Sequence, residues 1–199
     1  MSGIFDTLMS QLGNRELSGI AKQLGIDEAK AGSAVSAAVP VLLGALARNS
    51  SHDEGASSLE RALEKDHDGG ILDDVMGFVS NAEAGPGEGI LKHVLGGRRE
   101  GVESGISKST GLDAASVGKL MTTLAPLVMG AIGRQKRSSG LDATGLASLL
   151  ADERKEVERR EPHGFNILNS LLDSDGDGDV DGGDIAKRGF GLLGDILGK

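Results

Sequence analysis

The sequence contains no cysteine, no tryptophan and no tyrosine, and only four phenylalanines. Without cysteine the chain can form no disulfide, no thiolate nucleophile and no thiolate metal site. This fits a reducing compartment, and we expect a cytoplasmic protein. Because aromatic side chains are so few, the core must be built from aliphatic residues, whose content is that of a folded domain.

Positive charge and long apolar runs are also scarce. The net charge is -9 at pH 7, which argues against a general affinity for nucleic acid, because neutralising phosphates requires a surplus of Lys and Arg. The amino terminus has no basic region before an apolar run, and no apolar stretch approaches the ~20 residues of a membrane span. We therefore expect no membrane span. Basic clusters at 98–99 and 134–137 follow apolar segments, where we expect them to face a helix dipole and solvent.

Glycine, proline and the spacing of apolar residues divide the chain into short helices, and no stretch alternates as a β-strand does. The predicted fold class is all-α. The first two helices are expected over residues 4–12 and 17–24, and the third from an N-cap at Asp27 to about Arg48. Pro40 lies within the third helix and is expected to kink it.

A shift of 86 positions brings a second copy of the first segment into register, which indicates an internal duplication. The matching residues include Gly25 with Gly111, Asp27 with Asp113, Pro40 with Pro126, Gly44 with Gly130 and Arg48 with Arg134. The predicted architecture is multihelical, with two proline-kinked core helices. The expected parts are a first repeat (1–81), a second repeat (88–137), an amphipathic and charged helical insertion (138–162) and an EF-hand-like helix-loop-helix (163–199). The charge run in the insertion favours a solvent-exposed helix or tether.

The motif that carries chemistry is an acidic loop at residues 173–184. In an EF-hand loop, positions one, three, five, seven, nine and twelve bring oxygen ligands to calcium, and position six is glycine for a sharp turn. Gly178 occupies position six, and Asp184 occupies position twelve, where the EF-hand pattern has glutamate; in this respect the loop resembles dockerin repeats. We predict a calcium site, with magnesium also possible, formed by Asp173, Asp175, Asp177, Asp179, Asp181 and Asp184.

Residues 64–75 align with this loop at an offset of 109 positions. Val75 stands at position twelve, where it offers no carboxylate, so we interpret the segment as a degenerate EF-like loop. Two structural roles are open. The segment either braces the second loop through a contact between Ile71 and Val180, or it is an ordinary polar cap for a helix over 71–79.

Four segments resemble a bacterial family catalogued as domain of unknown function 937, which includes the YidB-like proteins. They are residues 66–74, 89–97, 110–113 and 124–130. The resemblance covers most of the chain, and members commonly carry a late loop rich in Asp and Gly. It implies an all-helical fold and no established activity.

The leading functional hypothesis is a calcium-binding structural or protein-interaction module, whose partner is another protein or a second copy of the chain. The alternative is a helix-turn-helix DNA-binding protein over residues 17–34 and their second copy, although its recognition helix lacks the Arg, Asn or Gln that reads base edges. We expect no enzyme, because the four histidines form no pair at metal-ligand spacing and no Ser lies in a nucleophile-elbow sequence.

Overall fold

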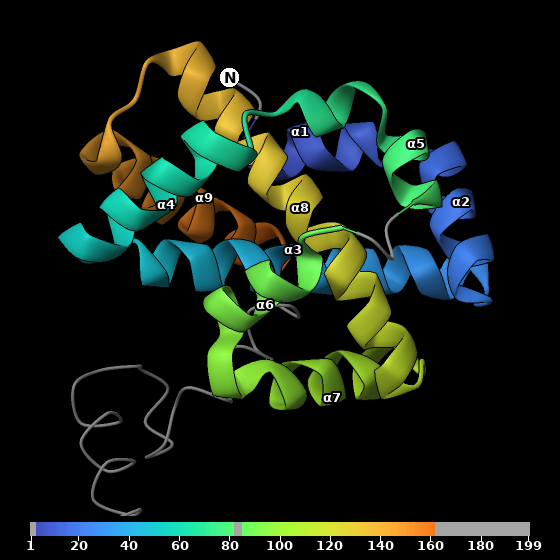
Figure 1. Cartoon of the computed structure of the whole chain (residues 1–199). Helices are drawn as coiled ribbons and strands as arrows, with labels where there is room; N and C mark the ends of the chain where they lie inside the picture. Colours follow the sequence, from blue (N-terminus) through green and yellow to red (C-terminus); the bar gives the residue numbers. More distant parts are fainter. Residues whose placement is uncertain (1–2, 82–84, 162–199) are drawn as a thin grey trace, which may run out of the picture.

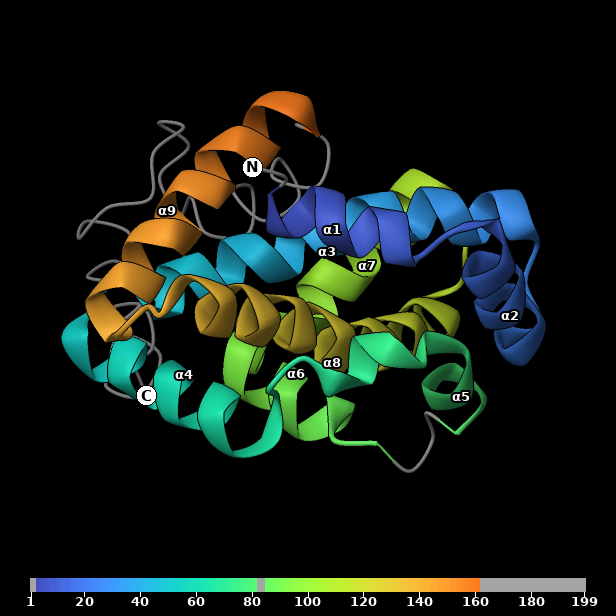
Figure 2. The same ribbon diagram turned by 90° about the horizontal axis from the view of Figure 1, so that it is seen from above.

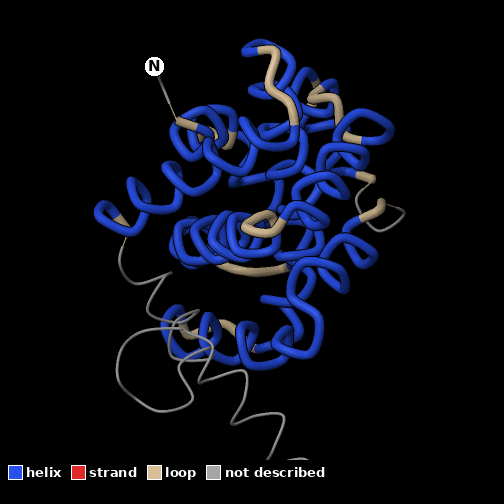
Figure 3. Tube along the Cα trace, turned by 90° about the vertical axis from the view of Figure 1, so that its left-hand side faces the viewer, coloured by secondary structure: helices blue, strands red, loops and turns tan. Residues whose placement is uncertain are grey.

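The computed structural model describes residues 3–81 and 85–161, and within them every regular element is helical (Figures 1 and 3). The elements are α1 (Ile4–Gln11), α2 (Asn14–Leu24), α3 (Glu28–Asn49), α4 (Asp53–Asp66), the 3-10 helix η1 (Gly70–Asp73), α5 (Val75–Ser80), α6 (Gly87–Leu95), the 3-10 helix η3 (Gly96–Arg98), α7 (Arg99–Thr110), α8 (Ala114–Ser139) and α9 (Ala143–Arg160). The all-α prediction is confirmed for this part of the chain. The helix-loop-helix predicted over 163–199 lies outside the described residues.

The two longest helices, α3 and α8, contact each other at the centre, and the shorter helices surround them (Figures 1 and 2). Both are buried on several sides, which explains why their sequences are apolar around most of the helix. The largest fully buried side chains are Leu, Ile and Met, whereas Phe5 and Phe78 are only partly buried. The core of the described chain is therefore aliphatic, as its composition predicted.

Helices α3 and α8 are also long and apolar enough to span a membrane, with mean hydropathies of 1.5 and 1.4 over their most apolar windows. This corrects the expectation that no apolar stretch approaches that length. In the structure, 72% and 78% of these windows are buried inside the protein. Their apolar character is accounted for by the helical core that they form.

Two helices of each sequence copy span corresponding residues: α2 and α3 in the first copy, and α7 and α8 in the second. Asp27 and Asp113, which are 86 positions apart, each cap a core helix: their carboxylates accept hydrogen bonds from the backbone N–H of Lys30 at 3.1 Å and of Ser116 at 2.9 Å. Gly25 and Gly111 end the preceding helices in the left-handed region, with φ of 68° and 69°. Pro40 and Pro126 each lie inside a continuous helix.

Helix α9 contains the charge run that favoured a solvent-exposed helix or tether, but it packs on α3, α4 and α1. Leu146, Leu150, Glu153 and Val157 are buried. These residues recur at helical spacing and form one stripe on the helix, so the charged residues between them lie on its other faces. Of the two alternatives, the charge run therefore forms a helix and not a tether, and the expectation of solvent exposure is wrong for the stripe that packs on the core.

Candidate functional site

The six aspartates predicted to bind calcium, at positions 173–184, lie outside the described residues. Within residues 3–81 and 85–161 no group of three or more His, Asp or Glu side chains is arranged to hold a metal ion. The residues to consider are therefore those of the first acidic segment, whose surroundings the structure shows.

The first acidic segment does not adopt the course of an EF-hand loop. Glu64, at position one, is still within helix α4, which continues to Asp66. The chain then turns at Gly69 and forms η1, and the Asp74 carboxylate caps α5 by accepting a hydrogen bond from the backbone N–H of Gly77 at 2.8 Å. Of the two roles left open by the sequence, the structure shows the polar cap, although the capped helix begins only at Val75. We call residues 67–74 the acidic strap.

The basic end of α8 holds the acidic strap. Arg134 donates hydrogen bonds to the carbonyl oxygen of Gly69 at 2.8 Å and to the carboxylate of Asp73 at 2.5 Å. Arg137 donates to the carboxylate of Asp68 at 3.0 Å. The expectation that this basic cluster faces only the helix dipole and solvent is therefore wrong, because its side chains fix a segment more than 60 residues earlier in the chain.

A third cation of α8 joins it to the helix that precedes the strap. The ammonium group of Lys136 lies 2.7 Å from a carboxylate oxygen of Glu64 and 3.4 Å from one of Glu60. Only 10% of the Lys136 side chain is exposed. The hydrogen bond to Glu64 raises the pKa of Lys136 above its usual value and outweighs the effect of burial.

Glycines allow the strap to lie directly on α8. A Cβ atom at Gly133 would be 1.8 Å from the carbonyl oxygen of His67, and one at Gly130 would be 2.4 Å from the Cγ2 of Ile71. The strap contributes a glycine of its own to this contact. Gly69 has a φ of +97°, and a Cβ there would be 2.7 Å from the Cβ of Arg134. The contact therefore depends on glycine in both partners.

The pKa values of two ionisable groups of the strap are lowered, which favours the neutral form of one and the charged form of the other. Burial lowers the pKa of His67, and the neighbouring Asp66 only partly offsets this, so His67 is neutral at pH 7. The pKa of Asp68 is also lowered, first by the backbone N–H of Gly70 and then by Arg137. At neutral pH the strap therefore presents carboxylates, and no competing positive charge, to the basic end of α8.

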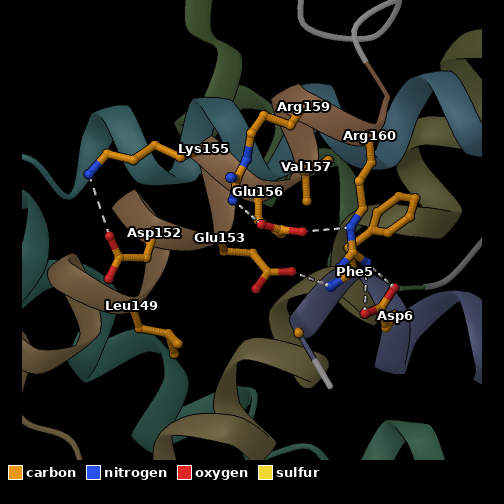
Figure 4. A pocket seen from close by; sticks show the side chains of 11 residues that line it. Phe5, Asp6, Leu149, Asp152, Glu153, Lys155, Glu156, Val157, Arg159 and Arg160 are labelled. Atoms are coloured by element: carbon orange, nitrogen blue, oxygen red, sulfur yellow. Dashed lines mark hydrogen bonds and ion pairs between the residues drawn. The ribbon is translucent and has the colours of Figure 1, made fainter. Parts of the chain in front are cut away.

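A cavity of ≈ 440 Å³ lies between the start of α1 and helix α9 (Figure 4). The charged side chains that line it have partners. Asp6 accepts two hydrogen bonds from Arg160 at 3.0 Å, and ion pairs join Lys155 to Asp152 and Arg159 to Glu156. Each of these charged side chains therefore has a partner of opposite charge on the cavity wall.

Glu153, on the same cavity, was not predicted from the sequence. Its carboxylate accepts a hydrogen bond at 2.7 Å from the backbone N–H of Phe5, 148 residues away, and only 8% of the residue is exposed. The α1 N-cap residue, Gly3, supplies no side-chain cap, so Glu153 performs this role from α9. The signal in the sequence was its position on the stripe formed by Leu146, Leu150 and Val157.

An ion-pair network joins α6, α7 and α8 on another face. Arg99 donates hydrogen bonds to Glu88 at 2.8 Å and to Glu103 at 2.6 Å, and the hydroxyl of Thr122 donates to Glu88 at 3.0 Å. The hydrogen bond from Arg99 is the main reason why the pKa of Glu88 falls from 4.5 to about 2. The network therefore stabilises the charged form of this carboxylate.

This network gives a prediction for acid stability. Because the folded-state pKa of Glu88 is below its unfolded value, its contribution to stability is complete above pH 4.5 and disappears as the pH falls towards about 2. We expect the stability difference between the wild type and Glu88→Gln to shrink between pH 5 and pH 3. Urea unfolding of both proteins at the two pH values measures this difference, and a constant difference would show that the network does not act through this carboxylate.

The described chain thus defines a class: an all-helical protein built on two long core helices, with an acidic segment fixed on the second of them. Residues 6–135 match the family described as bacterial protein of unknown function (DUF937), and the chain belongs to this family. No curated protein and no solved structure matches it. The matched region confirms the resemblance noted in the sequence and includes the strap and Arg134, but it ends before α9 and before the acidic loop at 173–184.

Proposed function

We propose that this protein is a calcium-binding helical module, in which the described helices form a scaffold and the loop at residues 173–184 binds one Ca²⁺. The observation that carries the proposal is the loop sequence, which places an aspartate at every ligand position and Gly178 at the turn. The proposed ligands are Asp173, Asp175, Asp177, Asp179, Asp181 and Asp184. Magnesium is a second ion that such an oxygen site accepts.

Comparison of the two repeats supports the need for an external cation. The carboxylates in and before the first acidic segment are neutralised by Arg134, Lys136 and Arg137 of α8. The residues 86 positions earlier are Arg48, in the last turn of α3, and Ser50 and Ser51, directly after its end. Two of the three cations are therefore missing at the corresponding end of α3, and carboxylates as closely spaced as those of the second loop repel one another unless a cation compensates them.

The metal would act by fixing the geometry of its own segment. A loop whose ligands all coordinate one ion has a single arrangement, and the residues on either side then present a defined surface. We propose that this surface is recognised by a protein partner or by a second copy of the chain. The described scaffold contributes a rigid support, because its long helices are buried against each other.

The DNA-binding alternative gains no support from the placement of its helices. Its recognition helix would be α3, or α8 in the second copy, and these are the two core helices. The start of α3, where this alternative has its recognition residues, is exposed at Glu28, Ala29, Lys30 and Ser33 and buried at Ala31 and Ala34. None of the exposed side chains is the Arg, Asn or Gln that reads base edges.

The proposal is tested by locating the metal on the full-length protein. We expect one equivalent of calcium, added to ¹⁵N-labelled and chelator-stripped protein, to shift the amide NMR signals of residues 173–184. In protein kept dilute enough to be monomeric, the signals of residues 64–75 should stay in place, because their carboxylates already have partners, as for Asp68 with Arg137. Shifts confined to residues 64–75, or the absence of any shift, would contradict the proposal.

A further inference from the structure

One face of helix α8 binds the acidic strap, and the strap shows what this face recognises. We call the face formed by Gly130, Gly133, Arg134 and Arg137 the α8 groove. It accepts a carboxylate on Arg137, a glycine carbonyl oxygen on Arg134 and a β-branched side chain over Gly130. In the strap these three features come from Asp68, Gly69 and Ile71, so the recognised pattern is Asp-Gly-x followed by a β-branched residue.

The chain contains this pattern a second time, in the proposed calcium loop. Asp177, Gly178 and Val180 stand 109 positions after Asp68, Gly69 and Ile71. The carboxylate, the glycine and the β-branched side chain are therefore all repeated at the same spacing. Glycine is the demanding element, because Gly69 has a φ of +97° and leaves no room for a Cβ against Arg134.

The corresponding face of α3 is unsuited to this pattern. Ala47 stands where α8 has Gly133, and a Cβ at Gly133 would be 1.8 Å from the strap's backbone. Ser51, just after the end of α3, stands where α8 has Arg137, so the cation for the aspartate is also absent. The face of the first repeat that would correspond to the α8 groove therefore cannot bind residues 177–180. The α8 groove has every feature that binding of this second pattern requires.

We propose that the α8 groove of one molecule binds residues 177–180 of a second copy of this chain in place of its own strap, and that calcium opposes this exchange. The regulatory half rests on the proposed calcium site. Calcium and Arg137 would compete for the carboxylate of Asp177, because one carboxylate in the coordination shell of a metal is no longer available to a guanidinium. Self-association is then favoured without calcium and reversed by it.

The test uses full-length protein carrying Gly69→Val and Gly178→Val, which displaces the strap from the groove and removes the competing pattern from the same chain. A fluorescently labelled peptide of residues 173–184 is titrated with this protein in chelator and followed by anisotropy. We expect saturable binding that is lost on adding Arg134→Ala and Arg137→Ala, and that weakens by about tenfold or more when the peptide carries Gly178→Val. Far-UV circular dichroism checks that each variant keeps its helices.

A milder variant, Asp68→Asn with Asp73→Asn, weakens the strap without adding any bulk and serves if Gly69→Val fails to fold. No binding of the peptide to folded forms of either variant would overturn the inference. Calcium uptake is measured on the full-length protein, because the isolated loop lacks the segments that flank it in the chain. Peptide binding in chelator, together with no uptake of calcium by the full-length protein, would support the groove and refute the calcium site, so the two proposals fail separately.

Sedimentation velocity on the full-length Gly69→Val protein separates binding between molecules from binding within one. We expect association that increases with protein concentration in chelator and is reversed by calcium. A protein that stays monomeric over the same range would overturn recognition of a second copy.

Discussion

Replacing Gly133 by alanine is expected to destabilise the protein by about 1–3 kcal/mol, although alanine is the better helix former. A Cβ at this position would be 1.8 Å from the carbonyl oxygen of His67 and 3.0 Å from its carbonyl carbon. These are backbone atoms, so no side-chain rotation relieves the overlap. The strap must move away from α8, which breaks the hydrogen bond from Arg134 to Gly69. Urea unfolding at pH 7 measures the loss.

Gly89→Ala is the matched control, because Gly89 also lies inside a helix, α6. No atom lies within 4 Å of a Cβ built at this position. We expect this substitution to stabilise the protein by roughly 0.4–1 kcal/mol, by restricting the unfolded chain and favouring the helix. Equal stabilisation by Gly133→Ala and Gly89→Ala would show that the strap does not lie against α8 as described.

Glu153→Ala is expected to cost about 1–3 kcal/mol, because it leaves the partly buried backbone N–H of Phe5 without its acceptor. The same change removes the carboxylate that faces the start of α1, where the helix dipole favours negative charge. Chemical unfolding measures the cost. Hydrogen exchange of the Phe5 amide gives a local measurement, and we expect it to become faster than in the wild type.

Two further variants separate the role of Glu153 from a general effect of charge on α9. Asp152→Ala removes an exposed carboxylate whose ion pair with Lys155 is 3.5 Å long, and we expect a change within about 0.5 kcal/mol. Glu153→Gln keeps an acceptor oxygen and should recover part of the lost stability. If Glu153→Ala behaved like Asp152→Ala, the proposed cap on α1 would be wrong.

The helix ends around residues 24–28 and 110–114 were predictable because their signals are local. A glycine in the left-handed region and an aspartate N-cap act within a few residues of their position, and both are explicit in Gly25, Asp27, Gly111 and Asp113. Because the second copy aligns at a shift of 86 residues, the helix ends predicted in the first copy also predicted those in the second. Local chemistry and repetition were sufficient for this part of the fold.

The site on α8 was not predictable in the same way, because it joins segments more than 60 residues apart. The sequence showed an acidic segment and a basic cluster, but an alignment with an EF-hand loop and a helix dipole each explained one of them separately. Gly130 and Gly133 were the feature of the sequence that could have indicated the contact. Two small residues at this spacing share one helix face and allow a backbone to approach it.

Glu153 illustrates a second limit. A glutamate within a run of alternating charges has the composition of a solvent-exposed helix, and only its spacing from Leu146, Leu150 and Val157 distinguishes it. Its partner, the N–H of Phe5, is a backbone group that every residue except proline has. The composition of the segment therefore suggested that Glu153 is exposed, whereas the packing of α1 on α9 buries it.

The most direct test of the central claim is a calorimetric titration of calcium, and then magnesium, into chelator-stripped full-length protein. We expect one calcium site of about micromolar affinity or tighter, and weaker binding of magnesium. The site should be lost in the variant that carries both Asp173→Ala and Asp184→Ala. The control variant Asp66→Asn, in the first acidic segment but before the strap, should bind as the wild type does. No calcium binding, or binding that survives the double substitution in residues 173–184, would contradict the account.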